Sequence, residues 1–348
     1  MPEQHIRNAW YVAAWSEEVT NEQPLGRTIL GEPLVLFRTS DGTAVAMDDR
    51  CSHRSYPLSA GVLCGDTIQC GYHGFEYDRD GACVRVPGQW RIPPGGRQRT
   101  YPVVESHRWI WVWTGDPALA DPAAVPDTHW MDDPAWDRVT HTRLFECEAG
   151  LLHDNLLDLT HETYVHKSTI GDDAVCENGI TVEVDGTVVS VDRFMPECFP
   201  SPLFARISGL ETADRWHTIE FQIPSVHVIH AGVTPPGTPR ETGYLLEVLN
   251  GITPAGPGQA WYFYAFCRNF AVGDAEINAL LTRSQGDVLD EDADALALQQ
   301  KALAGRDPAT TDVLIAQDAG VAKARRIIAQ LIAAESAGTA AAAVSSAR

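Results

Sequence analysis

Two histidines, His161 and His166, lie in the segment Asp154–His166 with four residues between them. On an ideal helix a step of five residues turns about 140°, so both imidazoles reach one metal ion only if the helix ends or bulges between them. Two histidines and one carboxylate that leave open positions are the ligand set typical of non-haem iron(II) that activates dioxygen. Two ordinary surface histidines on an amphipathic helix are the alternative, and this segment alone leaves both interpretations open.

The segment itself predicts one helix. Asp154 or Asn155 is suited to cap its start, and three leucines supply an apolar face: Leu156, Leu157 and Leu159. Asp158 precedes His161 by three positions, which puts both side chains on one side of the helix. We therefore expect the Asp158 carboxylate to orient the His161 imidazole through a hydrogen bond.

A second group of potential ligands lies upstream, where Cys51-Ser-His53 is followed after 16 residues by Cys70-Gly-Tyr-His73. Nearby glycine and proline residues predict tight, exposed loops: Pro57, Gly71 and Gly74. In a Rieske [2Fe-2S] cluster two cysteines hold one iron and two histidines hold the other. A zinc site is the alternative for the same four residues, but zinc sites usually space their paired ligands as C-x2-4-C or H-x3-5-H, and C-x-H does not match.

Taken together, the motifs resemble the oxygenase component of Rieske non-haem iron oxygenases, in the branch of the vanillate and dicamba O-demethylases. The resemblance extends from the segment Arg7–Ala13 to Asp318–Val321 and includes Cys267-Arg-Asn-Phe270. It implies a Rieske [2Fe-2S] cluster on Cys51, His53, Cys70 and His73, and a mononuclear iron(II) on His161, His166 and one carboxylate.

Asp292 is the expected third iron ligand. The helical pattern of Ala275–Ala304 places it on the apolar stripe, four residues after Val288 and four before Leu296. A carboxylate directed into a core is costly unless it is paired or bound to a metal, and the resemblance places the ligating carboxylate in this helix. Three acids off the stripe are expected to face solvent: Asp290, Glu291 and Asp294.

Length and composition indicate a globular protein of two domains. The chain has 348 residues and a formal net charge of -21, which disfavours nucleic acid and anionic membranes as partners. Its eight cysteines are scattered as in a reducing compartment, and no apolar run approaches the roughly 18 residues of a membrane span. The N-terminus has no apolar core of a signal peptide. We expect a cytoplasmic protein.

The expected fold class is α+β. Residues 1–120 are expected to form an antiparallel β domain that carries the cluster loops, and residues 121–337 the catalytic domain, with a boundary in the Pro- and Ala-rich stretch 115–126. The resemblance implies a curved antiparallel sheet packed on helices, as in helix-grip folds. An amphipathic helix is predicted over Val321–Ala334, and residues 338–348 are expected to form a disordered tail.

The activity implied by the resemblance is O-demethylation of a methoxylated aromatic acid with dioxygen, with vanillate giving protocatechuate and formaldehyde, as in lignin degradation. Hydroxylation of a methyl group or ring of a related aromatic acid is the alternative. The chain lacks a G-x-G-x-x-G motif and a plant-type four-cysteine ferredoxin spacing. Electrons are therefore expected from a separate NAD(P)H-dependent reductase with a ferredoxin domain.

The family also implies a homotrimer in which the cluster of one subunit faces the iron of its neighbour. Asp158 is expected to connect the two sites by accepting a hydrogen bond from the neighbour's His73. An electron-transfer Rieske protein without oxygenase activity and a zinc-stabilised binding protein are the alternatives from other functional classes.

No motif comparable to those of the metal ligands marks the residues that contact the substrate. Arg206 and Arg268 are candidates for a carboxylate clamp because a guanidinium pairs with a carboxylate in a planar, bidentate way; either is alternatively a structural ion pair. Asn155 and Asn250 are further candidates. Dicamba enzymes carry a histidine at the place of Asn250, which disfavours dicamba as the substrate.

Overall fold

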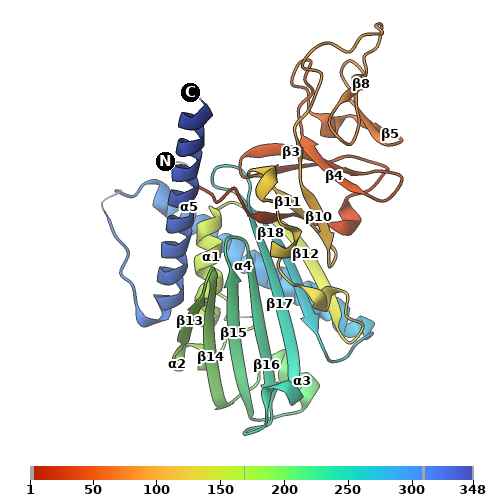
Figure 1. Ribbon diagram of the computed structural model, residues 1–348. Coiled ribbons are helices and arrows are strands. Elements are labelled where there is room, and N and C mark those ends of the chain that lie inside the picture. The colour runs from red at the N-terminus through yellow and green to blue at the C-terminus, as the bar shows by residue number, and fades with distance from the viewer. Residues whose placement is uncertain (1–3, 168, 308–309, 347–348) are drawn as a thin grey trace. The chain divides into compact units, whose positions relative to one another are not determined.

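The computed structural model describes residues 4–167, 169–307 and 310–346, and it divides into two compact units (Figure 1). The N-terminal unit consists of Arg7–Val125 together with the short segment Thr253–Pro257. The C-terminal unit consists of Pro126–Ile252, the chain from Gly258 onward and the described N-terminal residues up to Ile6. The α+β class predicted from the sequence is confirmed, because antiparallel sheets dominate both units and the long helices belong to the second.

The N-terminal unit contains three small antiparallel sheets. One has the order β1 (Trp10–Trp15), β11 (Trp109–Trp113), β10 (Val103–Ser106). A second has the order β2 (Leu25–Ile29), β3 (Glu32–Arg38), β4 (Ala44–Asp48), β9 (Thr100–Tyr101). The third has the order β5 (Val62–Cys64), β6 (Thr67–Gln69), β7 (Glu76–Tyr77), β8 (Cys83–Arg85). The tryptophans of the paired strands β1 and β11 are buried and pack against one another across the strands, with the ring centroids of Trp15 and Trp109 4.4 Å apart.

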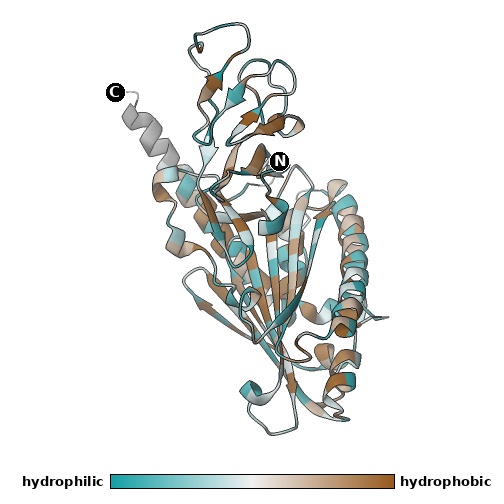
Figure 2. Ribbon diagram, turned by 90° about the vertical axis from the view of Figure 1, so that its right-hand side faces the viewer, coloured by the Kyte–Doolittle hydropathy of each residue, from teal (hydrophilic) through white to brown (hydrophobic). Residues whose placement is uncertain are grey.

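The C-terminal unit is organised around one seven-stranded sheet. Its strand order is β12 (Asp137–Phe145), β18 (Ala260–Arg268), β17 (Tyr244–Pro254), β16 (Val226–Thr234), β15 (Ala213–Gln222), β14 (Val188–Cys198), β13 (Thr181–Asp185). Hydrophobic and hydrophilic residues are mixed along the strands, as expected for a sheet with one buried face (Figure 2). Strand β12 was not predicted, because it is a polar edge strand in which only Val139 and Phe145 are buried.

Helices α1 (Ala149–Leu157), α4 (Ala275–Ala304) and α5 (Ala319–Ser346) pack against this sheet (Figure 1). Their apolar residues share one core cluster with the inward-facing residues of the strands. The unit also has shorter helices, which include α2 (Ala174–Glu177), α3 (Pro202–Ser208) and the 3-10 helix η6 (Leu159–Thr163). Among the described residues no helix is both long and apolar enough to cross a membrane.

Helix α4 has the bounds predicted from its periodicity. The Asp274 carboxylate caps it by accepting hydrogen bonds from the backbone amides of Glu276 and Ile277. Helix α5 extends to Ser346, so the backbone of residues 338–346 is helical where we expected a disordered tail. The alanine-rich composition of that stretch explains the difference, since alanine has the highest helix propensity. Residues 347 and 348 lie outside the described residues.

The helix predicted to start at Asp154 is different in the structure. Helix α1 begins at Ala149 and ends at Leu157, and η6 follows after Asp158. The cap prediction for Asp154 and Asn155 is therefore wrong, and the Asp154 carboxylate pairs with Arg325. Helix α1 ends before both histidines, and η6 ends at Thr163, between His161 and His166. The helical path is therefore broken between the two histidines, which is the condition that allows both to approach one ion.

Candidate metal centres and substrate cavity

The two Cys-x-His and Cys-x-x-His stretches form loops with the same backbone hydrogen bonds. In the first loop the Cys51 amide donates to the Tyr56 carbonyl at 2.8 Å, and the Cys51 carbonyl accepts from the amide of Ser55 at 2.9 Å. The second loop repeats both bonds at the same offsets from Cys70, at 2.8 and 3.0 Å. The fourth residue after each cysteine has a left-handed backbone, with φ of 54° at Ser55 and 71° at Gly74. The predicted tight loops are therefore present.

These loops bring the four predicted cluster ligands together. Cys51 and Cys70 are each 2% exposed, whereas His53 and His73 are exposed and their ring centroids lie 4.6 Å apart. Burial raises the pKa of Tyr77 to about 12, so its hydroxyl keeps its proton; this hydroxyl lies 3.2 Å from Cys51 Sγ and is suited to donate to it. Two buried sulfurs and two surface imidazoles fit a cluster with one iron inside and one at the surface.

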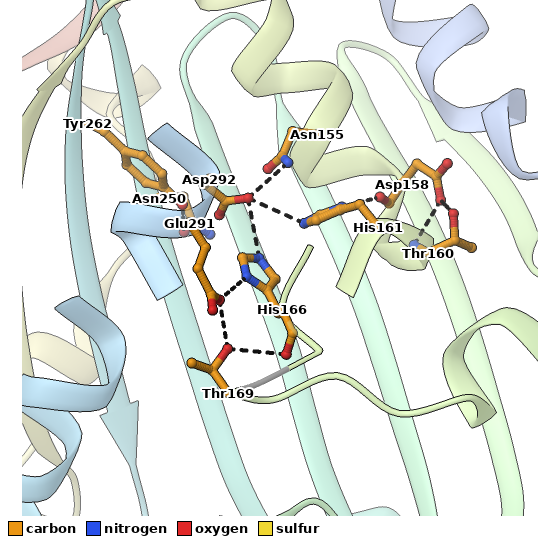
Figure 3. Close-up of polar contacts among 10 residues, drawn as sticks. All are labelled: Asn155, Asp158, Thr160, His161, His166, Thr169, Asn250, Tyr262, Glu291 and Asp292. Carbon is orange, nitrogen blue, oxygen red and sulfur yellow. Dashed lines mark hydrogen bonds and ion pairs between the residues drawn. The ribbon is translucent and has the colours of Figure 1, made fainter. Parts of the chain in front are cut away.

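The C-terminal unit gathers His161, His166 and Asp292 at one point, with their ligand atoms all within 4.8 Å of one another (Figure 3). Asp292 Oδ1 lies 3.2 Å from His166 Nε2 and 3.7 Å from His161 Nε2. His161 lies in η6 and His166 in the turn after it, and Asp292, only 7% exposed, comes from the buried stripe of α4. The expected third ligand from a distant helix is thus in place beside the two histidines.

Hydrogen bonds leave both Nε2 atoms free to bind a metal. His161 Nδ1 donates to the Asp158 backbone carbonyl at 2.7 Å, and His166 Nδ1 donates to Glu291 Oε2 at 2.8 Å. Because these oxygens only accept, the protons lie on Nδ1 and the Nε2 lone pairs face Asp292. Burial lowers the pKa of His161, which favours the neutral, metal-binding form. For His166 burial acts in the same direction, but contacts with Asp292 and Glu291 outweigh it and raise the pKa.

Asp158 acts on His161 through its backbone, which corrects our prediction for its carboxylate. The chain leaves α1 at Asp158 in an extended conformation, so its carbonyl turns toward the imidazole. Its carboxylate Oδ1 instead accepts from the Thr160 amide at 3.0 Å and the Thr160 hydroxyl at 2.7 Å. Both bonds use Oδ1, and Oδ2 has no hydrogen bond within the described parts of the chain.

Glu291 was expected to face solvent, and that expectation is wrong. Its carboxylate holds His166 and also accepts from the Thr169 hydroxyl at 2.8 Å (Figure 3). Asp290 and Asp294 are exposed as expected, with Asp290 paired to Arg143. The position of Glu291 beside Asp292 was the only sequence signal, because its partner lies 125 residues away along the chain.

A cavity of about 370 Å³ adjoins the histidines and Asp292. Most of its lining is apolar and comes from the sheet, α3 and α4. Representative lining residues are Leu203, Phe204, Ile229, Leu246, Val248, Phe266 and Leu281. Its size and its few polar groups are typical of a site for a small organic ligand.

The four predicted substrate residues have different positions. Arg206 lines the cavity from α3, and its side chain is exposed. Arg268 is fully buried and pairs with Asp137 at 3.1 Å, outside the residues that line the cavity, so it is the structural ion pair and not a clamp. Asn155 lines the cavity and donates to Asp292 Oδ1 at 3.2 Å, which orients this carboxylate.

Asn250 lines the cavity, but its amide is already occupied. Its Nδ2 donates to the carbonyls of His227 and Val248 at 3.1 and 3.0 Å, and its Oδ1 accepts from the Tyr262 hydroxyl at 2.8 Å. A substrate contact through this amide would break one of these buried bonds. Asn250 therefore holds Tyr262, and the predicted direct substrate role is not supported by its contacts.

Three ionisable residues of the cavity were missed: Glu162, Arg215 and His217. Burial raises the pKa of Glu162 to about 7 and lowers that of His217 to about 3. Arg215 is 4% exposed and pairs with Asp172 at 2.5 Å. Arg215 and His217 alternate with Trp216 on a strand, and this period of two was the available signal that both face one side.

Two family models cover most of the chain. Residues 9–102 match the Rieske [2Fe-2S] domain, and residues 145–334 match the vanillate O-demethylase oxygenase C-terminal domain. The cluster ligands predicted here fall inside the first match, and His161, His166 and Asp292 fall inside the second.

Individual proteins are similar over most of their length. The chain is 36% identical to the vanillate O-demethylase oxygenase subunit of Pseudomonas sp. (strain HR199 / DSM 7063), over 94% of this chain and 95% of that protein. It is 40% identical to the oxygenase component of dicamba O-demethylase from Stenotrophomonas maltophilia, over 82% and 84%. A crystal structure of dicamba monooxygenase with non-heme iron and dicamba superposes with a TM-score of 0.86 at 34% identity, over 96% of this chain and 99% of that one.

Proposed function

The chain belongs to the vanillate O-demethylase oxygenase family of Rieske proteins, and from this membership we propose that it removes the methyl group of a methoxylated aromatic acid, with vanillate as the substrate. As a member of this family it is an oxidoreductase, a monooxygenase with a [2Fe-2S] cluster and a mononuclear non-haem iron. The observation that carries the proposal is the position of the two histidines and Asp292 in the wall of a largely apolar cavity.

The donor set fits both metal groups. Cys51, His53, Cys70 and His73 would hold the cluster, and His161, His166 and Asp292 would hold iron(II), whose role when bound is to activate dioxygen. The protein's own contribution is to orient the ligands: the Asp158 carbonyl and the Glu291 carboxylate hold the imidazoles, and the Asn155 amide holds Asp292.

The overall reaction must balance. One oxygen atom of dioxygen enters the methoxy carbon, the other leaves as water, and two electrons and two protons are consumed. The hydroxylated methoxy group, a hemiacetal, then releases formaldehyde and leaves a phenol, which is protocatechuate if the substrate is vanillate. The apolar walls, including Val248, Phe266 and Leu281, are suited to exclude bulk water and to pack on an aromatic ring.

The electrons are proposed to come from a separate NAD(P)H-dependent reductase with a ferredoxin domain. We further propose a homotrimer in which the electron passes from the cluster of one subunit to the iron of the next. His73 is exposed on its unit, and Asp158 Oδ2 has no hydrogen bond among the described residues. The Asp158 carboxylate is therefore suited to accept a hydrogen bond from His73 of a neighbouring chain, while the Asp158 backbone carbonyl holds His161.

A single-turnover experiment tests the activity without the reductase. The holoenzyme is reduced, mixed with dioxygen and one of several methoxybenzoates, and assayed for formaldehyde and the matching phenol. We expect both products in equal amounts from vanillate. Hydroxylated aromatic acid without formaldehyde would instead identify hydroxylation of a methyl group or ring as the activity.

A further inference from the structure

Two polar residues on the cavity wall take no part in holding the iron ligands. Arg215 and His217 lie two positions apart on β15, so their side chains emerge on the same face of the sheet, and both line the cavity. In the sheet register His217 lies opposite Arg193 of β14 and Ala231 of β16. An interior strand of the sheet therefore carries the pair, which is a rigid support for a binding group.

His217 presents a hydrogen-bond donor to the cavity. Burial, and then the charges of Arg215 and Arg193, lower its pKa to about 3, so the imidazole is neutral at pH 7. Its Nδ1 atom is enclosed and has no hydrogen-bond partner in the described structure. An enclosed N–H without an acceptor is rarer in proteins than an unsatisfied lone pair, which favours the tautomer with the proton on Nε2. The ring therefore offers an N–H, and not a base, to a ligand.

Arg215 has unused donors as well. Its guanidinium makes its hydrogen bonds through Nη1, to Asp172 Oδ2 at 2.5 Å and to the Phe199 carbonyl at 3.2 Å. A guanidinium has five N–H donors, two of them on Nη1. The Cys198 thiol lies beside the guanidinium as a weak acceptor. Within the residues that the structure describes, no oxygen atom accepts from Nε or Nη2.

Other polar groups of the same wall are already paired. The Tyr262 hydroxyl donates to Asn250, whose own amide protons are bound to backbone carbonyls. The Tyr264 hydroxyl donates to Gln285 Oε1 at 2.6 Å. The donors that remain for a ligand on the sheet wall are thus those of Arg215 and His217.

We propose that Arg215 and His217 form an oxyanion subsite that holds the carboxylate of an aromatic acid while the iron site acts on another part of the molecule. This inference rests on the proposed function, since it names how that substrate is held. A carboxylate is an acceptor at both oxygens and pairs well with a guanidinium edge and a neighbouring N–H. The corresponding neutral amide lacks the charge and keeps only one acceptor oxygen, while its NH2 group places donors against the donors of Arg215 and His217.

The test compares the binding of vanillate with that of its neutral amide, vanillamide, to the anaerobic holoenzyme by equilibrium dialysis. We expect the wild type to prefer the acid by roughly 10- to 100-fold, as for a hydrogen-bonded charge. His217→Phe should reduce this preference about tenfold, and His217→Gln should retain part of it because its amide can still donate. The control is His230→Gln, a histidine of β16 that pairs with Glu247 outside the cavity lining.

Two further variants should move the preference in opposite directions. Asp172→Asn removes the counter-charge of Arg215 and should strengthen binding of the acid relative to the amide. Arg215→Gln, made together with Asp172→Asn to avoid an unpaired carboxylate, should weaken it. The acid-to-amide ratio is insensitive to partial unfolding, because unfolding lowers the binding of both ligands alike.

An unchanged ratio in His217→Phe and in the Arg215 variant would overturn the subsite, as would an equal loss of both ligands. Formaldehyde release from vanillate by the wild type, with unchanged ratios in the variants, would refute the subsite and leave the proposed function standing. Shifted acid-to-amide ratios in the variants, without formaldehyde release by the wild type, would support the subsite and refute the proposed function.

Discussion

Replacing Glu291 by glutamine tests whether this residue holds an iron ligand. The variant keeps the size of the side chain and one oxygen that can accept from His166 Nδ1, but it removes the negative charge. The bond is 2.8 Å long and the His166 side chain is only 2% exposed, so little water screens the interaction. Loss of such an outer partner typically weakens metal binding 10- to 100-fold, which corresponds to about 1.4–2.8 kcal/mol.

The assay is an anaerobic titration of the holoenzyme with an iron(II) chelator, in which the retained mononuclear iron is measured while the visible spectrum of the cluster reports the N-terminal unit. Glu291→Gln should release iron at about 10- to 100-fold lower chelator concentration than the wild type. Glu291→Ala should release it more readily, because the imidazole loses its acceptor altogether.

Asp294→Asn is the matched control, since it removes the same charge from the same helix at an exposed position. If Glu291→Gln and Asp294→Asn release iron alike, the effect is a long-range loss of charge and the orienting role is refuted. Equal iron retention in Glu291→Gln and the wild type would also refute the role of Glu291 in orienting His166.

Four other outcomes follow from the structure. Cys70→Ser should bleach the visible absorbance of the cluster and leave the C-terminal unit folded, as measured by iron content at the second site; an unchanged spectrum would refute the ligand assignment. Asp292→Asn should lose about one iron in three and all formaldehyde release with the cluster spectrum intact, because a neutral amide is a poor ligand for a hard cation. Asp158→Ala should keep both metal centres, because the backbone carbonyl that holds His161 remains. It should abolish turnover, because the carboxylate proposed to accept a hydrogen bond from the neighbouring chain is lost; turnover at the wild-type rate would contradict that electron route. Burial lowers the pKa of His153 from 6.5 to about 3, so below pH 6.5 the unfolded state binds a proton that the folded state does not, and stability falls toward pH 3. Urea unfolding at pH 7 and pH 5 should show a smaller loss in His153→Gln than in the wild type.

The sequence alone was sufficient where a local pattern has one physical meaning. Helix α4 followed from its apolar period, and Asp292 stood out because a carboxylate on a buried stripe needs a partner. The glycine and proline residues near Cys51-Ser-His53 and Cys70-Gly-Tyr-His73 predicted tight loops, and both loops are present, each with a left-handed residue, Ser55 or Gly74. The antiparallel β character of the N-terminal domain was also expected from the sequence.

The tertiary structure decided which groups meet across long distances in the chain. Glu291 and Asp294 lie three positions apart on one helix, yet only Glu291 reaches His166, because α4 packs beside the segment after α1. Arg206 and Arg268 were equivalent candidates by sequence, and only the pairing of Arg268 with Asp137 removed it from the cavity. The packing of neighbouring elements likewise decides which hydrogen-bond donors of Arg215 and His217 are available to a ligand. Hydrogen-bond partners are set by the packing of distant elements, and no local periodicity records them.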